Sequence, residues 1–219
     1  MHTPTRSCLA LLAVFLFAAA PGSAFEFPLS DSASRAAYFL GQRRDLSMGE
    51  FLARYSKHLP APKSGPYVSD VLFLTPFAQL VQYSSRQGIY SAQQAELDGR
   101  TKITTVEVTV YIYFTETYGA YIVEAANSRS STPGVRLRSP DFWRDFTYKV
   151  LGGDELLEPA ELYGEPQYRC VDEGGCLLIG AEIHLSVPAE LFTSDSAFVE
   201  VSTPDDQLVT AEFNLASLR

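Results

Sequence analysis

The amino-acid sequence predicts an α+β fold, with N-terminal helices packed on a mostly antiparallel β-sheet or β-sandwich. Helix-capping patterns lie in the first hundred residues, a long stretch of two-residue periodicity follows, and short strands separated by Pro, Gly and Asp turns fill the rest. We divide the chain into a signal peptide over residues 1–24, a helical segment over 25–66 and a mainly β region over 67–219. The last two should form one globular unit.

The first 24 residues have the composition of a cleaved secretory signal. Arg6 precedes an unbroken apolar run, Cys8–Ala20, and residues 22–24 supply the small side chains favoured before a cleavage site. The run is too short to cross about 30 Å of hydrocarbon, and no other stretch reaches the length of a transmembrane helix. We therefore expect a secreted or periplasmic protein that does not span the membrane after cleavage.

Two helices are predicted at the start of the remaining chain. Ser30 precedes a run of good helix formers that extends to about Leu40. Ser47 and Glu50 form an S-x-x-E capping pattern for a second helix, which we expect to continue to Leu59 with one apolar face. Prolines and a glycine follow and lead into the β region.

A strand and two further helices are predicted next. The strand Tyr67–Leu74 ends in four consecutive apolar residues, a pattern typical of a strand that is covered on both faces. Thr75 and Pro76 are suited to the start of a helix that runs to about Arg86. Ser91 is placed to cap a shorter helix that ends near the next glycine.

The stretch Lys102–Phe114 is predicted to be a long strand at the centre of the sheet. Apolar side chains occupy every second position, and β-branched or aromatic residues dominate both faces. After it we expect a strand at 120–126 that forms a hairpin with the long strand. Further expected elements are a short strand at 135–137, a helical turn at 139–146, and strands at 147–151, 177–187, 197–202 and 208–215.

Cys170 and Cys176 are predicted to form a disulfide. An exported protein meets oxidising conditions, and the intervening VDEGG segment contains residues that favour a turn. A redox pair would more often have two intervening residues, and a metal site would need further ligands that the sequence does not offer. We therefore expect a structural staple on a short hairpin or loop, without a metal or cofactor.

The acidic composition excludes some partners. The chain has 17 Lys and Arg residues against 26 Asp and Glu residues, a net charge of −9. Removal of residues 1–24 takes away one arginine and no acid, which changes the net charge to −10. Such a surface repels phosphate backbones and anionic lipids, so we expect no nucleic-acid partner.

Aromatic residues are the candidates for ligand binding. Tyr111 and Tyr113 share the less apolar face of the long strand, and Trp143 falls on a nearby segment. Tyrosine and tryptophan rings combine a large apolar surface with a polar group, which suits them to recognition of sugars or peptides. The competing interpretation is that the predicted helices cover this face and make both tyrosines ordinary core residues.

No catalytic site is predicted. His58 and His184 are the histidines that remain after signal removal, and His184 lies between Glu182 and Ser186 at strand spacing. Residues two apart on a strand are separated by about 6.5 to 7 Å, too far for direct hydrogen bonds between short side chains. A solvated sheet face explains this trio better than a catalytic group.

The absence of local catalytic signatures favours a non-catalytic binding or assembly module whose partner is another protein or an extracellular polymer. Such a module would use sheet edges or the tyrosine-bearing face. The alternative is an exported hydrolase of cell-wall or extracellular polymer, with carboxylates around Glu107, Glu116 and Glu124 as its candidate acids.

Overall fold

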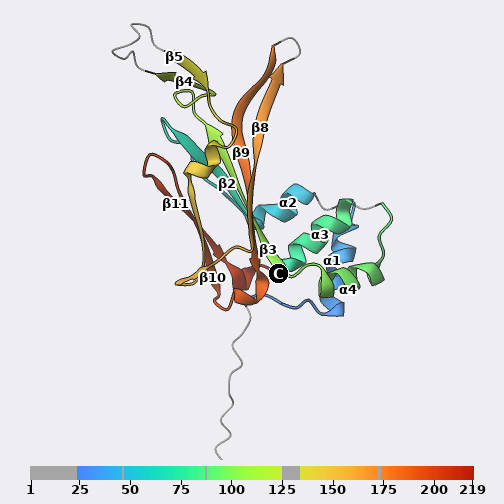
Figure 1. Cartoon of the computed structure of the whole chain (residues 1–219). Helices are drawn as coiled ribbons and strands as arrows, with labels where there is room; N and C mark the ends of the chain where they lie inside the picture. Colours follow the sequence, from blue (N-terminus) through green and yellow to red (C-terminus); the bar gives the residue numbers. More distant parts are fainter. Residues whose placement is uncertain (1–23, 46, 87, 125–133, 172–173) are drawn as a thin grey trace, which may run out of the picture.

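The computed structural model describes residues 24–45, 47–86, 88–124, 134–171 and 174–219, with Glu124 described by its backbone alone. The expected signal peptide, apart from Ala24, lies outside these residues. The two larger sheets have five and four strands, and the helices gather to one side of the five-stranded sheet (Figure 1). The α+β class with a mostly antiparallel sheet is therefore confirmed.

The helical layer forms where the capping patterns predict it. Ser30 accepts a hydrogen bond from the amide of Ala33 at the start of the first helix, and Ser91 accepts one from Gln94 at the start of the last. Thr75 caps the third helix through the amide of Ala78. The helices are α1 (Asp31–Gly41), α2 (Met48–Leu52), α3 (Pro76–Arg86) and α4 (Ala92–Thr101).

The second helix is shorter than its sequence pattern suggests. It ends at Leu52, one turn of 3-10 helix follows, and the chain then forms strand β1 (Ser56–His58). Ser47 precedes the helix but makes no side-chain capping bond. Because β1 pairs with a neighbouring strand, tertiary hydrogen bonding overrides the local helical pattern over the residues before Leu59.

The five-stranded sheet has the order β1-β2-β3-β9-β8, and every neighbouring pair is antiparallel. Strand β3 (Thr105–Phe114) lies in the middle, as its periodicity predicts. Its partners are β2 (Pro66–Leu74) and β9 (Gly175–Pro188), and β8 (Glu161–Val171) forms one edge.

The second sheet has the order β11-β10-β6-β7 and packs on one face of the first. Its strands are β6 (Thr147–Gly152), β7 (Glu155–Leu157), β10 (Ser196–Ser202) and β11 (Leu208–Asn214). Phe73 of the first sheet stacks on Phe213 of the second, with ring centroids 5.0 Å apart, and contacts Phe192 edge-on at 5.5 Å. The valines of β3 lie in this interface and are buried.

One prediction about pairing was wrong. The strand expected at 120–126 is β4 (Tyr121–Glu124), and it pairs with β5 (Gly134–Leu137) rather than with β3. Both edges of β3 are already occupied by β2 and β9, which leaves no place for a third neighbour. The acidic stretch before Glu165, where the sequence predicts no strand, contains β7 and the start of β8.

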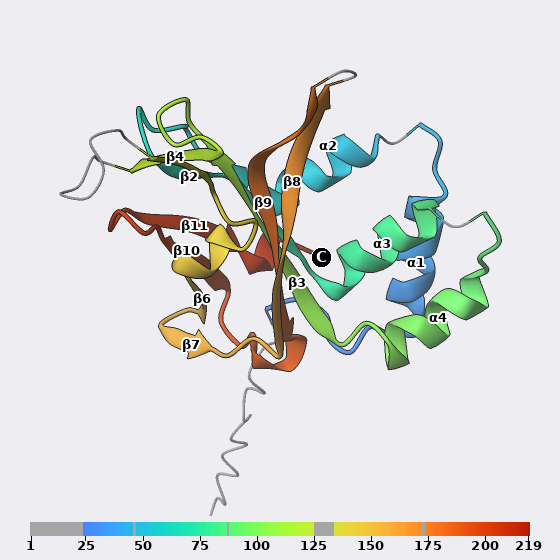
Figure 2. The ribbon, with the colours of Figure 1, turned by 45° about the horizontal axis from the view of Figure 1, so that its top comes forward.

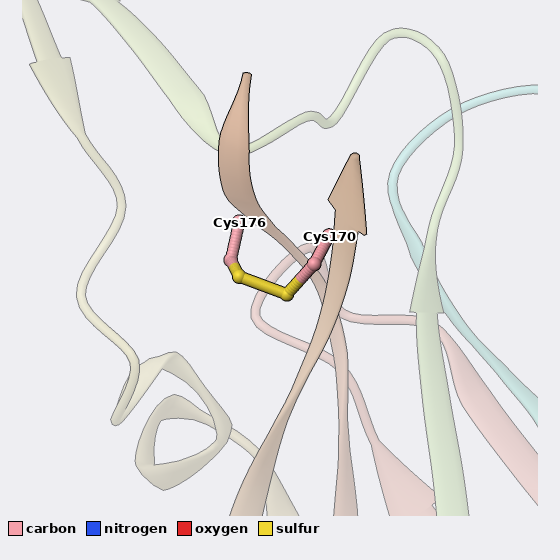
Figure 3. Close-up of a disulfide and its surroundings, with 2 residues drawn as sticks. All are labelled: Cys170 and Cys176. Carbon is pink, nitrogen blue, oxygen red and sulfur yellow. A yellow bond between two sulfur atoms is a disulfide. The ribbon is translucent and has the colours of Figure 1, made fainter. Parts of the chain in front are cut away.

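The predicted disulfide is confirmed. Cys170 and Cys176 face each other across the end of the β8–β9 hairpin, with Cα atoms 4.0 Å apart (Figure 3). The hairpin extends beyond the two sheets, away from α4 (Figure 1). The cystine therefore ties together the projecting part of the molecule rather than its core.

Candidate functional site

The face of the five-stranded sheet that points away from the second sheet forms the candidate site, and we call it the open face. It consists of four cross-strand rows, in which the β3 residues are Glu107, Thr109, Tyr111 and Tyr113. The β9 residues of these rows are Ser186, His184, Glu182 and Gly180. The β8 residues are Glu161, Tyr163, Glu165 and Gln167.

The helical layer leaves much of this face uncovered because it is attached at one end of the strands. The Gln79 side-chain amide on α3 donates hydrogen bonds to the carbonyls of Leu74 and Thr105, at 3.0 and 2.7 Å. These residues lie at the end of β2 and the start of β3. The helices α1 and α4 then lie against α3, beside the sheet rather than across it (Figure 2).

A groove of about 550 Å³ lies between α3 and the open face, and we call it the acidic groove. The sheet contributes its floor and α3 contributes the opposite wall through Gln82, Tyr83 and Arg86. Side chains from β3 and β9 carry its polar chemistry: Glu107, Thr109, Tyr111, Glu182 and His184.

A second hollow of about 430 Å³ continues the groove toward α2, and we call it the apolar hollow. Leu52 of α2 and Tyr113 of β3 line it, and Asp70 lies at its polar side. Leu72 and Tyr111 line both hollows, so the two share a common border. The open face therefore offers one elongated concave surface.

Tyr111 and Tyr113, the two tyrosines predicted to bind a ligand, lie side by side on this surface. Neither is fully buried, so the helices do not convert them into core residues. Burial raises the pKa of the Tyr111 hydroxyl to about 12, and the negative charge and hydrogen bond of Glu182 add to the shift. A Cβ atom at Gly180 would lie 3.1 Å from the Tyr113 ring, so this glycine lets the ring lie close to β9.

The carboxylates of the groove receive hydrogen bonds from neutral groups. Glu107 accepts from the hydroxyls of Thr105, at 2.6 Å, and of Ser186. Glu182 accepts from the Gln167 amide at 3.1 Å. Within the described part of the chain, neither glutamate forms an ion pair with a lysine or arginine. Both acids therefore keep an uncompensated charge at the surface of the groove.

His184 lies in the middle of the open face and is held by two neighbours. The Tyr163 ring stacks on its imidazole at 4.8 Å between centroids and 22° between planes. Its Nδ1 atom lies 3.4 Å from the Thr109 hydroxyl. Among the described residues, no hydrogen bond joins His184 to Glu182 or Ser186. The trio shares a face, as strand spacing predicts, but is not connected as a catalytic relay.

Trp143, the third residue predicted to bind a ligand, lies elsewhere. It belongs to a 3-10 turn, Phe142–Asp145, and is only 4 % exposed. Its ring packs on Gly164 of β8, which is paired with the core residue Ile183. The structure therefore places Trp143 on the core side of the sheet and does not bring it together with the two tyrosines.

Glu165 and Tyr163 are site residues that the sequence reasoning missed. Glu165 is directly opposite Glu182, and Tyr163 is directly opposite His184. The signal was present in the sequence, because Glu161, Tyr163, Glu165 and Gln167 alternate with other residue types at strand spacing.

Neither a metal centre nor a membrane helix is evident in the described chain. No group of three or more His, Cys, Asp or Glu side chains is arranged there to hold a metal ion. No described helix is both long enough and apolar enough to cross a membrane. No family model, curated protein or solved structure matches this chain.

Proposed function

We propose that this protein is a non-catalytic binding module that holds an extended segment of a partner protein on the open face. The observation that carries the proposal is the position of Tyr111, whose side chain borders both hollows and remains accessible. On the opposite face of β3, the side chains from Val106 to Ile112 are buried. An accessible concave surface on which aromatic side chains and polar groups converge is a usual form of a binding site.

A secreted or periplasmic location completes the proposal. The sequence of residues 1–24 has the pattern of a secretory signal, and the Cys170–Cys176 disulfide fits an oxidising compartment. Partner recognition would therefore take place outside the cytoplasm, on a protein that carries a disulfide.

The open face suits a partner better than the edge of the sheet. The edge strand β8 contains Pro166, which has no amide hydrogen to donate to an added strand. The register of β8 also shifts between Gln167 and Tyr168, where the ladder is irregular. These two features oppose strand addition along β8 and direct recognition to the face.

The geometry gives less support to the hydrolase alternative. Glu107 lies near the start of β3, and Glu116 lies in the turn beyond its end. About 23 Å of strand, from Glu107 to Phe114, therefore lies between them. The Glu124 side chain lies outside the described residues. Glu165 and Glu182 are close, but both project from one sheet at its exposed edge, whereas a glycosidase flanks the scissile bond with its two acids.

Peptide display tests the proposed function without assuming a ligand charge. A random peptide library would be selected on the immobilised protein, and enriched peptides would be measured against Tyr111→Ala. We expect affinity to fall at least ten-fold, because the substitution removes an aromatic side chain that lines both hollows. Tyr168→Ala is the matched control, since Tyr168 is 48 % exposed and lines neither hollow. Enriched peptides that bind Tyr111→Ala as well as the unaltered protein would contradict the proposal.

A further inference from the structure

We infer that the open face recognises a positively charged, extended peptide, with one arginine or lysine side chain held between Glu165 and Glu182 beside the ring of Tyr111. This inference rests on the proposed function and adds the chemical class of the partner. It is carried by four features of the open face: its charge, its opposed carboxylates, the ring of Tyr111 and its length.

The charge of the open face is one-sided. Within the described strands, its four rows present five carboxylates and no lysine or arginine. His58 lies beside one of these acids, with its Nδ1 atom 3.1 Å from Asp70. A concave surface lined by one sign of charge concentrates its field and attracts a ligand of the opposite sign. The five carboxylates belong to Asp70, Glu107, Glu161, Glu165 and Glu182.

Two of these acids occupy directly opposed positions on neighbouring strands. Glu165 and Glu182 are directly opposed on β8 and β9, an arrangement that places Cβ atoms about 4.5 to 5.5 Å apart. Like charges at this position destabilise a sheet, and neither acid is ion-paired with a lysine or arginine of the described chain. A guanidinium or ammonium group between them would relieve the repulsion and form charge-assisted hydrogen bonds.

Tyr111 provides a second attraction at the same place. It is the β3 residue directly opposite Glu182, so a cation that reaches this carboxylate lies next to the phenol ring. Tyrosine rings attract cations through their electron-rich faces, and the effect grows when the cation is shielded from water. A carboxylate next to an aromatic ring favours an organic cation over a hard metal ion, because such a metal ion prefers oxygen ligands alone.

The length of the surface indicates a peptide rather than a small amine. The rows from Glu107 to Tyr113 span about 20 Å along the strand, which an extended chain covers with about six residues. The apolar hollow beyond Tyr111 offers Leu52, Leu72 and Tyr113 to an apolar side chain. A short polyamine would leave this hollow empty, whereas a peptide with basic and apolar residues fills both.

Substitution of Arg86 should change the affinity in the direction opposite to substitution of a carboxylate. Among the described residues that line the acidic groove, Arg86 is the one lysine or arginine, and it lies at the last position of α3. Its charge opposes the entry of a cationic ligand. Removal of this charge should therefore strengthen binding, while removal of a carboxylate should weaken it.

Fluorescence anisotropy with defined peptides tests the inference. The probe is a labelled ten-residue peptide in which arginine alternates with alanine and leucine, and the comparison peptide has glutamine in place of arginine. We expect the arginine peptide to bind at least ten-fold more tightly. Glu182→Gln or Glu165→Gln should weaken it about five- to ten-fold, and Arg86→Gln should strengthen it several-fold.

Glu212→Gln is the matched control for net charge. Glu212 is exposed on β11 of the second sheet, so this substitution removes one negative charge far from the open face. It should leave the affinity unchanged. Equal weakening by Glu212→Gln and Glu182→Gln would overturn the inference, since the attraction would then be nonspecific.

Two further outcomes separate this inference from the proposed function. If the glutamine peptide binds as tightly as the arginine peptide and Tyr111→Ala weakens both, the open face binds peptides but not through their charge. Saturable binding of Ca²⁺ alone, lost in Glu182→Gln and without binding of either peptide, would replace the peptide by a metal ion. Either result overturns the inference, and only the second also contradicts the proposed function.

Discussion

Glu165 and Glu182 face each other across neighbouring strands of the open face, with no lysine or arginine of the described chain paired to either. Opposed carboxylates are unfavourable for a sheet that has only to fold. Sites that bind a ligand often keep an arrangement that the free protein would be more stable without. A bound cation between the two carboxylates should therefore stabilise the sheet.

Reversal of one charge should stabilise the sheet. In Glu165→Lys, the new ammonium group lies opposite Glu182, so repulsion becomes attraction and the free energy of unfolding should rise by about 0.5 to 1 kcal/mol. Urea denaturation measures the change, and a high-salt experiment should reduce it. A less stable Glu165→Lys protein at low salt would show that the two side chains do not interact.

Loss of the cystine should lower stability modestly. Replacement of both Cys170 and Cys176 by serine removes a short loop constraint worth about 2 kcal/mol in the chain-entropy model. Hydrogen exchange should increase most at the end of the β8–β9 hairpin and little in β3. Alkylation of the native protein without reductant, followed by mass measurement, should add no label to these cysteines. Labelling at that step would contradict the disulfide.

The contact between Trp143 and Gly164 should be sensitive to a single methyl group. A Cβ atom at position 164 would lie 2.4 Å from the nearest atom of the Trp143 ring, so Gly164→Ala forces the ring to move. We expect a loss of about 1 to 3 kcal/mol in unfolding free energy and a shift in tryptophan fluorescence. Gly119→Ala is the control, because no heavy atom lies within 4 Å of its added Cβ. Equal stability of the two variants would contradict this packing.

The Tyr111 hydroxyl should make stability depend on alkaline pH. Its pKa is about 12 in the folded protein because of burial and Glu182, against 10.0 ordinarily, so the unfolded chain releases this proton first. The stabilisation is complete below pH 10 and disappears as pH rises from about 10 to about 12. Tyr111→Phe should therefore lose less stability over this interval than the unaltered protein. Their difference in phenolate absorbance should have its midpoint near pH 12, and a midpoint near pH 10 would contradict the burial of this hydroxyl.

Local signals in the sequence predict much of the fold. The caps at Ser30, Thr75 and Ser91 and the alternation along β3 depend on neighbouring residues, and the structure confirms all of them. Strand partners depend on distant residues. The pairing of β4 with β5 and the early end of α2 follow from which edges are already occupied, and periodicity does not contain that information.

The candidate site is also predictable only in part, because local spacing can be read from the sequence and strand register cannot. Two-residue spacing places Tyr111 and Tyr113 on one face, and this face is the one that remains open. Trp143 shares only its aromatic character with them, and tertiary packing puts it in the core. The Glu165–Glu182 pair arises from the register of β8 against β9, which has to be seen in the structure.

Chemical-shift mapping of the isotope-labelled protein tests the central claim most directly. Titration with the arginine peptide should move the backbone signals of Thr109, Tyr111, Glu182 and Glu165, which belong to three neighbouring strands of the open face. Signals of β10 and β11 on the second sheet should remain unchanged. Shifts confined to the second sheet or to the β4–β5 hairpin, with the open face unaffected, would contradict the account.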